Sequence, residues 1–205
     1  MKYLIVGTPR SGTTFMSKLF TSAGWPTNHE AWFGNPGYGT WLRDATGEAS
    51  WMALPFTEEV KRRNKDARIV HIIRNPLKVI SSLMHSNFLT YKAFQRNAYT
   101  MYLKSQLPEI VAYEDLDRYI FFWMRWNQEC RKRADLTYRI EDINKDLGKI
   151  FKDLKMEVKE DVEFHSDKKT NGYKGVKQMK LKDFEECVFY DEFIKVAKEF
   201  GYELE

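Results

Sequence analysis

Three short apolar runs along the chain have the length of strands and predict buried strands of a sheet. They cover residues 2–6, 67–73 and 136–140. Between and after these runs, apolar side chains recur at helical spacing, as in residues 13–23, where Phe15, Met16, Leu19 and Phe20 would share one face. Further helices are predicted over residues 77–84, 112–133, 141–154 and 190–203.

Strands that alternate with helices predict an α/β fold with a parallel β-sheet flanked by helices. A chain of 205 residues is long enough for one well-cored domain and short for two. No repeat or linker divides it, so we expect a single domain over residues 1–205. The stretch 24–41, rich in glycine, tryptophan and proline, is predicted to be a long surface loop. Ligands are expected at the carboxyl ends of the strands.

The sequence GTPRSGTT, residues 7–14, links the first predicted strand to the first predicted helix. Gly7 and Gly12 have the spacing of a phosphate-binding loop, whose backbone N–H groups and helix start attract anions. A plain strand-to-helix turn capped by Thr13 is the alternative, but the flanking elements and Arg10 at the loop tip favour phosphate. Triphosphatases place lysine where Thr13 stands, which argues against ATP or GTP hydrolysis.

A second phosphate site is predicted in RNPLKVISS, residues 74–82. Arg74 ends a strand, and Ser82 lies about two turns into the next helix, so both side chains could converge on one phosphate. Ser81 is the substitute for Ser82. An arginine paired with a nearby acid, beside a serine on the helix surface, is the alternative interpretation.

Together these motifs resemble sulfotransferases that use 3′-phosphoadenosine 5′-phosphosulfate (PAPS). Residues 8–14 look like their 5′-phosphosulfate loop, and residues 74–82 look like their 3′-phosphate motif, in the same order. Similarity to bacterial sulfotransferases extends to residues 47–56, 118–127 and 138–143. The resemblance implies a P-loop-type α/β architecture and transfer of a sulfuryl group from PAPS to an acceptor oxygen or nitrogen.

The resemblance also implies which residues bind PAPS. Thr13 and Thr14 would hold the 5′-phosphate, and Arg10 would stabilise the negative charge that grows on the leaving phosphate. Lys168 and Lys169 begin a loop near the end of the chain that contains further lysines and glycines. This loop matches part of the family's third motif, and a solvated loop is an equally good interpretation. The whole expected set is Pro9, Arg10, Ser11, Gly12, Thr13, Thr14, Arg74, Ser82, Lys168 and Lys169.

A base is also needed to deprotonate the acceptor. Relatives often carry a catalytic glutamate or histidine in the loop after the first helix, which makes Glu30 the first candidate and His29 the second, beside Arg10 in the catalytic set. A solvated loop acid is the alternative for Glu30. Four nearby aromatic side chains either wall an acceptor cleft or pack in the core: Trp25, Trp32, Phe33 and Trp41.

Charge and cysteine content limit which ligands, metals and cellular compartment are expected. The net charge of +4 fits an anionic ligand, but it is so evenly mixed along the chain that nucleic acid is not expected. Cys130 and Cys187 are far apart and predict reduced thiols, and no cluster predicts a metal. No membrane span or leader is predicted, so we expect a cytoplasmic protein.

Two other functions remain open at this point. A P-loop kinase of a small metabolite would share the fold, but it should carry a lysine after Gly12 and an acidic magnesium ligand. A non-catalytic nucleotide-binding module would keep the phosphate site without turnover. The acceptor of a sulfotransferase is also open between a glycan, a lipid headgroup, a phenol and a peptide tyrosine.

Overall fold

The computed structural model describes residues 1–34, 42–90, 98–158 and 175–204. The chain divides into two compact units. The first comprises Met1–Arg74 and Glu129–Gly172, and the second comprises Asn75–Gln128 and Tyr173–Glu205. Each unit has its own packing.

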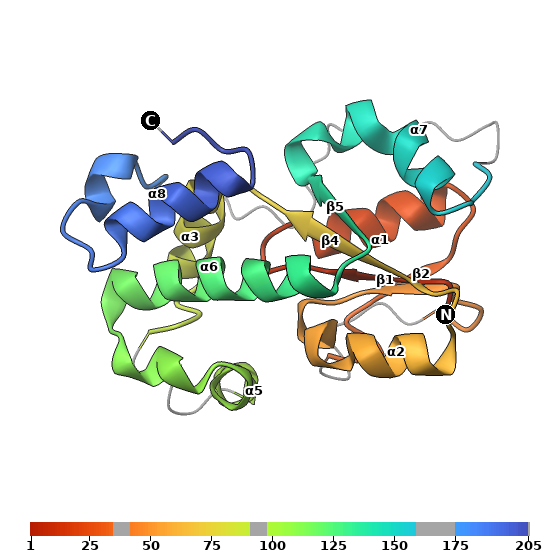
Figure 1. Ribbon diagram of the computed structural model, residues 1–205, viewed down its shortest axis with the longest axis horizontal. Coiled ribbons are helices and arrows are strands. Elements are labelled where there is room, and N and C mark those ends of the chain that lie inside the picture. The colour runs from red at the N-terminus through yellow and green to blue at the C-terminus, as the bar shows by residue number, and fades with distance from the viewer. Residues whose placement is uncertain (35–41, 91–97, 159–174, 205) are drawn as a thin grey trace. The chain divides into compact units, whose positions relative to one another are not determined.

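The first unit is built on a parallel sheet of five strands in the order β2-β3-β1-β4-β5 (Figure 1). Central β1 pairs with β3 on one side and β4 on the other, so that Leu4 lies opposite both Glu48 and Ile69. This parallel sheet confirms the predicted α/β class and the three predicted strands. The strands are β1 (Tyr3–Val6), β2 (Thr27–His29), β3 (Gly47–Ala49), β4 (Arg68–Ile73) and β5 (Leu136–Arg139).

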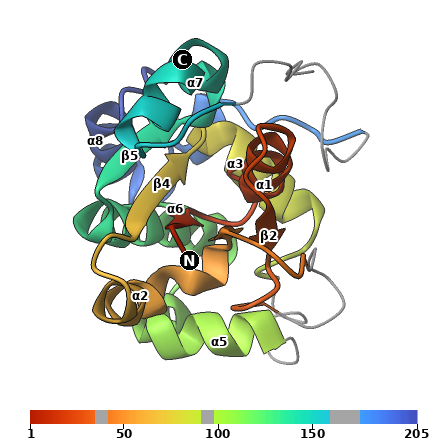
Figure 2. The ribbon, with the colours of Figure 1, turned by 90° about the vertical axis from the view of Figure 1, so that its right-hand side faces the viewer.

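Helices cover both faces of this sheet. Figures 1 and 2 show α1 (Thr13–Ser22) and α7 (Ile143–Asp153) on one face and α2 (Thr57–Arg63) on the other. On the first face, alternate side chains of β1 and β4 pack against both helices, because successive strand residues point to opposite faces. The members of this core include Tyr3, Ile5, Met16, Phe20, Val70, Ile72, Ile150 and Phe151.

The prediction of a continuous loop over residues 24–41 is wrong at β2. A strand of three residues is too short to show a periodic pattern, and its first two side chains are polar. Both are fully buried, and each has at least one hydrogen-bond partner. Thr27 Oγ1 lies 2.6 Å from Tyr3 Oη, and Asn28 Oδ1 accepts the Leu42 N–H at 2.6 Å. Strand β3 and helix α2 were likewise not predicted.

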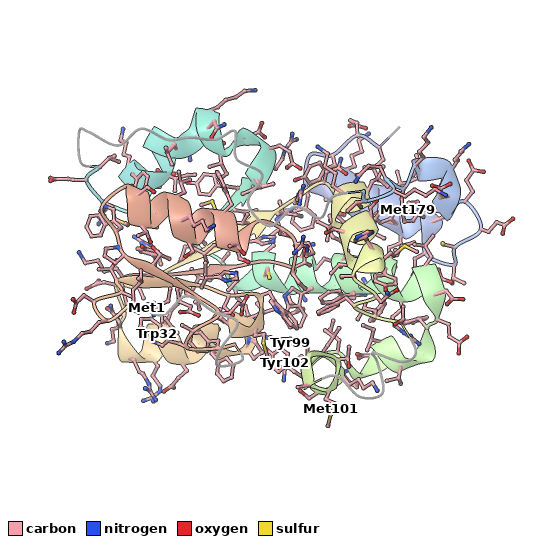
Figure 3. The ribbon with its side chains drawn as sticks, turned by 180° about the vertical axis from the view of Figure 1, so that it is seen from behind. Met1, Trp32, Tyr99, Met101, Tyr102 and Met179 are labelled. Atoms are coloured by element: carbon pink, nitrogen blue, oxygen red, sulfur yellow. The ribbon has the colours of Figure 1, made fainter. Side chains whose placement is uncertain are left out.

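The second unit is helical and aromatic. Trp123 meets the rings of Phe193 and Phe200 edge-on, and Arg125 forms an ion pair of 2.8 Å with Glu192. Met101 points away from its helix and is 62% exposed (Figure 3). The helices are α3 (Pro76–His85), α5 (Ala98–Gln106), α6 (Asp115–Arg133), whose end belongs to the first unit, and α8 (Tyr190–Glu199).

Two boundaries differ from the sequence prediction by three residues or more. Residues 108–112 form a 3₁₀ helix, so the long aromatic helix begins at Asp115. The last helix ends at Glu199, before Gly201, whose φ of 79° leaves the helical region. Across the residues that the structure describes, no helix is both long and apolar enough to cross a membrane.

Candidate functional site

The predicted phosphate loop lies between the carboxyl end of β1 and the start of α1. Its conformation depends on both glycines. A Cβ on Gly7 would lie 2.3 Å from the backbone oxygen of Ile72, so β4 approaches too closely for any side chain. Gly12 caps α1 with a φ of 105°, which favours glycine. The residue that caps α1 is therefore Gly12 and not Thr13, whereas phosphate binding by the loop stays a prediction.

Side chains inside the loop brace it. Thr8 and Ser11 are fully buried, and their hydroxyl oxygens lie 2.5 Å apart. The Ser11 N–H also donates to the Thr8 carbonyl at 3.1 Å. Arg10, at the tip, has a left-handed φ of 72°. The loop thus turns tightly in front of the positive end of α1, which suits a phosphate group.

Arg74 lies beside this loop, directly after β4. Its Nη1 donates to the backbone carbonyl of Arg10 at 3.0 Å, so the side chain supports the loop tip. Ser82 lies on α3 in the second unit and is buried. The expected convergence of Arg74 and Ser82 on one phosphate stays a prediction.

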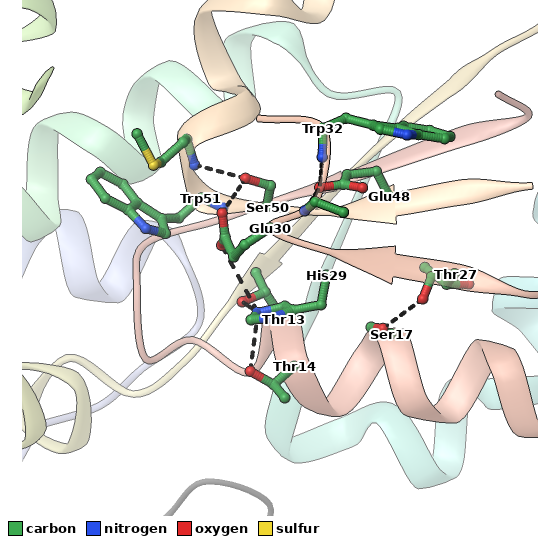
Figure 4. Close-up of polar contacts among 12 residues, drawn as sticks. Thr13, Thr14, Ser17, Thr27, His29, Glu30, Trp32, Glu48, Ser50 and Trp51 are labelled. Atoms are coloured by element: carbon green, nitrogen blue, oxygen red, sulfur yellow. Dashed lines mark hydrogen bonds and ion pairs between the residues drawn. The ribbon is translucent and has the colours of Figure 1, made fainter. Parts of the chain in front are cut away.

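His29, the last residue of β2, faces the start of α1 (Figure 4). Its Nε2 lies 3.0 Å from Thr14 Oγ1 and 3.3 Å from Thr13 Oγ1. Burial, assisted by the charge of Lys18, lowers the pKa of His29 to about 4. The ring is therefore neutral at pH 7 and is joined to the two threonines expected to hold the 5′-phosphate.

Glu30 follows β2 and turns toward the end of β3 instead. Its carboxylate accepts the Ser50 hydroxyl at 2.5 Å and the Trp51 N–H at 3.1 Å, and its Oε1 lies 3.9 Å from His29 Nε2. Burial raises the pKa of Glu30 to about 7, against the opposing effect of the two hydrogen bonds. A carboxyl with this pKa accepts a proton far more readily near neutral pH than an ordinary one does.

A second carboxyl, which the sequence analysis did not assign, lies next to this turn. Glu48 on β3 is fully buried, and its Oε1 accepts the N–H groups of Ala31 at 2.8 Å and Trp32 at 3.2 Å. Burial raises its pKa to about 7, and the charge of Glu30 adds to the shift. The one signal in the sequence was an acid inside the short stretch GEAS, which also supplies Ser50.

The structure describes three of the four aromatic side chains expected around the acceptor, and the acceptor cleft itself stays a prediction. Trp25 packs against the core, and its Nε1 donates to the Glu157 carbonyl at 2.7 Å. Trp32 is 37% exposed (Figure 3), and Phe33 stacks on Phe56 with ring centroids 5.1 Å apart. Trp41, Lys168 and Lys169 lie outside the described residues.

The two cysteines and possible metal ligands are the remaining candidates. Cys130 and Cys187 are both free thiols. Among the residues that the structure describes, no group of three His, Cys, Asp or Glu side chains is arranged to hold a metal ion.

A comparison with protein families agrees with the motifs. The family model described as "Sulfotransferase domain" matches residues 1–156. A sulfotransferase from Alicyclobacillus acidocaldarius is 15% identical, with 97% of this chain and 94% of that chain covered and a TM-score of 0.46. Mouse sulfotransferase SULT7A1, solved with PAP, is 17% identical, with 77% and 60% covered and a TM-score of 0.40. A search of curated proteins found no significant match.

Proposed function

The chain belongs to the sulfotransferase domain family, and we propose that it transfers the sulfuryl group of PAPS to the hydroxyl or amine of an acceptor. The proposal includes a sulfotransferase domain that spans residues 1–205. It also assigns the 5′-phosphosulfate to the loop that contains Pro9, Arg10, Ser11, Gly12, Thr13 and Thr14, and the 3′-phosphate to Arg74 and Ser82.

In the proposed reaction the acceptor attacks sulfur from the side opposite the leaving phosphate. A bond forms between the acceptor atom and sulfur, and the bond from sulfur to the bridging oxygen breaks. Glu30 takes the acceptor's proton, and adenosine 3′,5′-bisphosphate (PAP) leaves with the bonding electrons. Arg10 and the start of α1 stabilise the negative charge that grows on the phosphate oxygen.

The observation that carries the proposal is the position of Glu30 next to the phosphate loop. A neutral His29 lies between the Glu30 carboxylate and the two threonines. Its Nε2 is 3.9 Å from Glu30 Oε1 and 3.0 Å from Thr14 Oγ1. A base in this place is near the sulfuryl end of a bound donor, where the acceptor has to arrive. Thr13 in place of a lysine weakens the kinase alternative, which needs that lysine at the terminal phosphates.

Thermal unfolding with added nucleotides tests the donor assignment. PAP at about 100 times its dissociation constant should stabilise the protein by about 2.7 kcal/mol, with a clear rise in melting temperature. ATP with magnesium should stabilise it much less. Equal stabilisation by ATP, or none by PAP, would contradict a sulfotransferase site.

Turnover tests the acceptor side and separates an enzyme from a binding module. Sulfur-labelled PAPS is incubated with separate pools of glycans, lipids, phenols and tyrosine peptides, and transfer of label into one pool is expected. Binding of PAP without transfer into any pool would favour the non-catalytic module instead.

A further inference from the structure

Glu48 is a buried carboxyl that the proposed reaction does not use. It lies in β3, opposite Asn28 of β2 and Leu4 of β1, and none of its surface is exposed. Its Oε1 accepts two backbone N–H groups, and its Oε2 has no hydrogen-bond partner among the described residues. Burying a carboxylate oxygen without a partner is costly, so this charge calls for an explanation.

The two amides that Glu48 holds belong to the residues directly after Glu30. Glu30 itself has a φ of 51°, a left-handed conformation that residues other than glycine seldom adopt. The Ser50 hydroxyl and the Trp51 N–H hold its carboxylate from the end of the same strand (Figure 4). Strand β3 therefore fixes both the turn, through Glu48, and the carboxylate that the turn presents.

Anchoring the turn does not by itself require a charge. The amide oxygen of a glutamine could accept the same two N–H groups, and a neutral side chain would be less costly to bury. The carboxyl of Glu48 is therefore the feature that anchoring leaves unexplained. Glu30 is the carboxyl with which it interacts: Ser50, two residues after Glu48, holds the Glu30 carboxylate, and the charge of Glu30 raises the pKa of Glu48.

We propose that Glu48 is a positioning residue for Glu30: it fixes the orientation of Glu30 through the following turn, and the two carboxyls form an electrostatically coupled pair. This inference rests on the proposed function, in which Glu30 is the base. A carboxyl whose proton affinity matches the working pH is a more effective base than an ordinary one, which binds the acceptor's proton too weakly.

The groups around Glu30 support this assignment of charge. From β2 it meets His29, which is neutral at pH 7, and from the end of β3 it meets Ser50 and Trp51, which do not titrate in this range. Lys18 of α1 acts on His29. Repulsion between the two carboxylates is mutual, so each raises the pKa of the other and they lose protons as a coupled pair.

The test is a carboxyl titration that needs no acceptor. Protein carrying glutamate labelled with ¹³C at Cδ is titrated by NMR, with Glu30 and Glu48 assigned from the Glu30→Gln and Glu48→Gln variants. In Glu48→Gln the midpoint of Glu30 should fall by about 1 pH unit, the scale on which a neighbouring charge moves a carboxyl pKa. Glu58→Gln, which removes an exposed acid on α2, is the matched control and should leave it unchanged.

An unchanged Glu30 midpoint in a folded Glu48→Gln variant would overturn the proposal. Should that variant not fold, the reciprocal measurement decides, because Glu30→Gln must lower the midpoint of Glu48 if the two are coupled. Once an acceptor is known, the acid limb of kcat/KM in Glu48→Gln should move to lower pH with PAP affinity unchanged. If the titration shows that the two carboxyls are coupled in the wild type but Glu30→Gln keeps full turnover, then the assignment of Glu30 as the base is wrong and the coupling still holds.

Discussion

At the scale of single residues, His29 and Glu30 are neighbours that burial affects in opposite directions. Burial favours the neutral form of each, so the pKa of His29 falls to about 4 and the pKa of Glu30 rises to about 7. An imidazole with a pKa near 4 is a weak base at neutral pH. The glutamate accepts a proton in the working range, which supports it over His29 as the base.

Substitution of each neighbour tests this ranking. Glu30→Gln keeps the shape and removes the basicity, so turnover should fall by about 10² to 10⁴ while PAP affinity holds. His29→Ala should lower turnover less, and it should weaken PAP binding modestly, because the ring contacts Thr13 and Thr14. Initial rates and calorimetry measure the two effects. The reverse ranking of rates, in folded proteins, would make His29 the base.

At the scale of elements, the phosphate loop takes its form from the strand beside it. Gly7 lies against the backbone of Ile72 in β4, and Arg74 at the end of β4 donates to the Arg10 carbonyl. Such bracing preorganises the loop before the donor binds, which lowers the cost of ordering it. Arg74 thereby acquires two separable roles: support of the loop and the predicted contact with a 3′-phosphate.

Two nucleotides that differ in one phosphate separate these roles. Arg74→Ala should weaken PAP binding about tenfold or more if its guanidinium meets the 3′-phosphate, because a charged hydrogen bond is lost. Adenosine 5′-monophosphate lacks that phosphate, so its affinity should change little. Calorimetric titration of both ligands measures this, with the exposed Arg63→Ala as control. Equal losses for both nucleotides would mean that Arg74 acts only through the loop.

The length and pairing of the elements also explain which parts of the fold the sequence could predict. Strands β1, β4 and β5 could be predicted because each lies in an apolar run, and their helices because apolar residues recur in them at helical spacing. Strands β2 and β3 have three residues each and depend on pairing with one another and with β1. Glu30 was proposed from a family resemblance, whereas Glu48 reaches Ala31 only through the pairing of β2 with β3. No local pattern of residues signals a contact of that kind.

At the scale of the whole molecule, the family match covers residues 1–156, whereas the proposed domain runs to residue 205. The chain contains two compact units, each with buried aromatic side chains. A single domain predicts one cooperative unfolding transition, with calorimetric and van't Hoff enthalpies that agree. The pH dependence of this one transition then sums the contributions of all groups whose pKa differs between the folded protein and the unfolded chain.

The buried carboxyl pair gives that stability a characteristic dependence on pH. Glu30 and Glu48 have folded-state pKa values of about 7, above their ordinary value of 4.5, so between these limits the native protein binds more protons than the unfolded chain. Their contribution to the free energy of unfolding must therefore fall as the pH rises through this window. His29, lowered from 6.5 to about 4, contributes in the opposite sense.

A variant with Glu30→Gln and Glu48→Gln together isolates the carboxyl contribution, because His29 and the exposed acids are unchanged in it. Its melting temperature minus that of the wild type should rise steadily from about pH 5 to about pH 8, since only the wild type then carries buried charge. Differential scanning calorimetry at several pH values measures this difference. A difference that stays constant across the range would show that the two carboxyls titrate in the folded protein as they do in the unfolded chain.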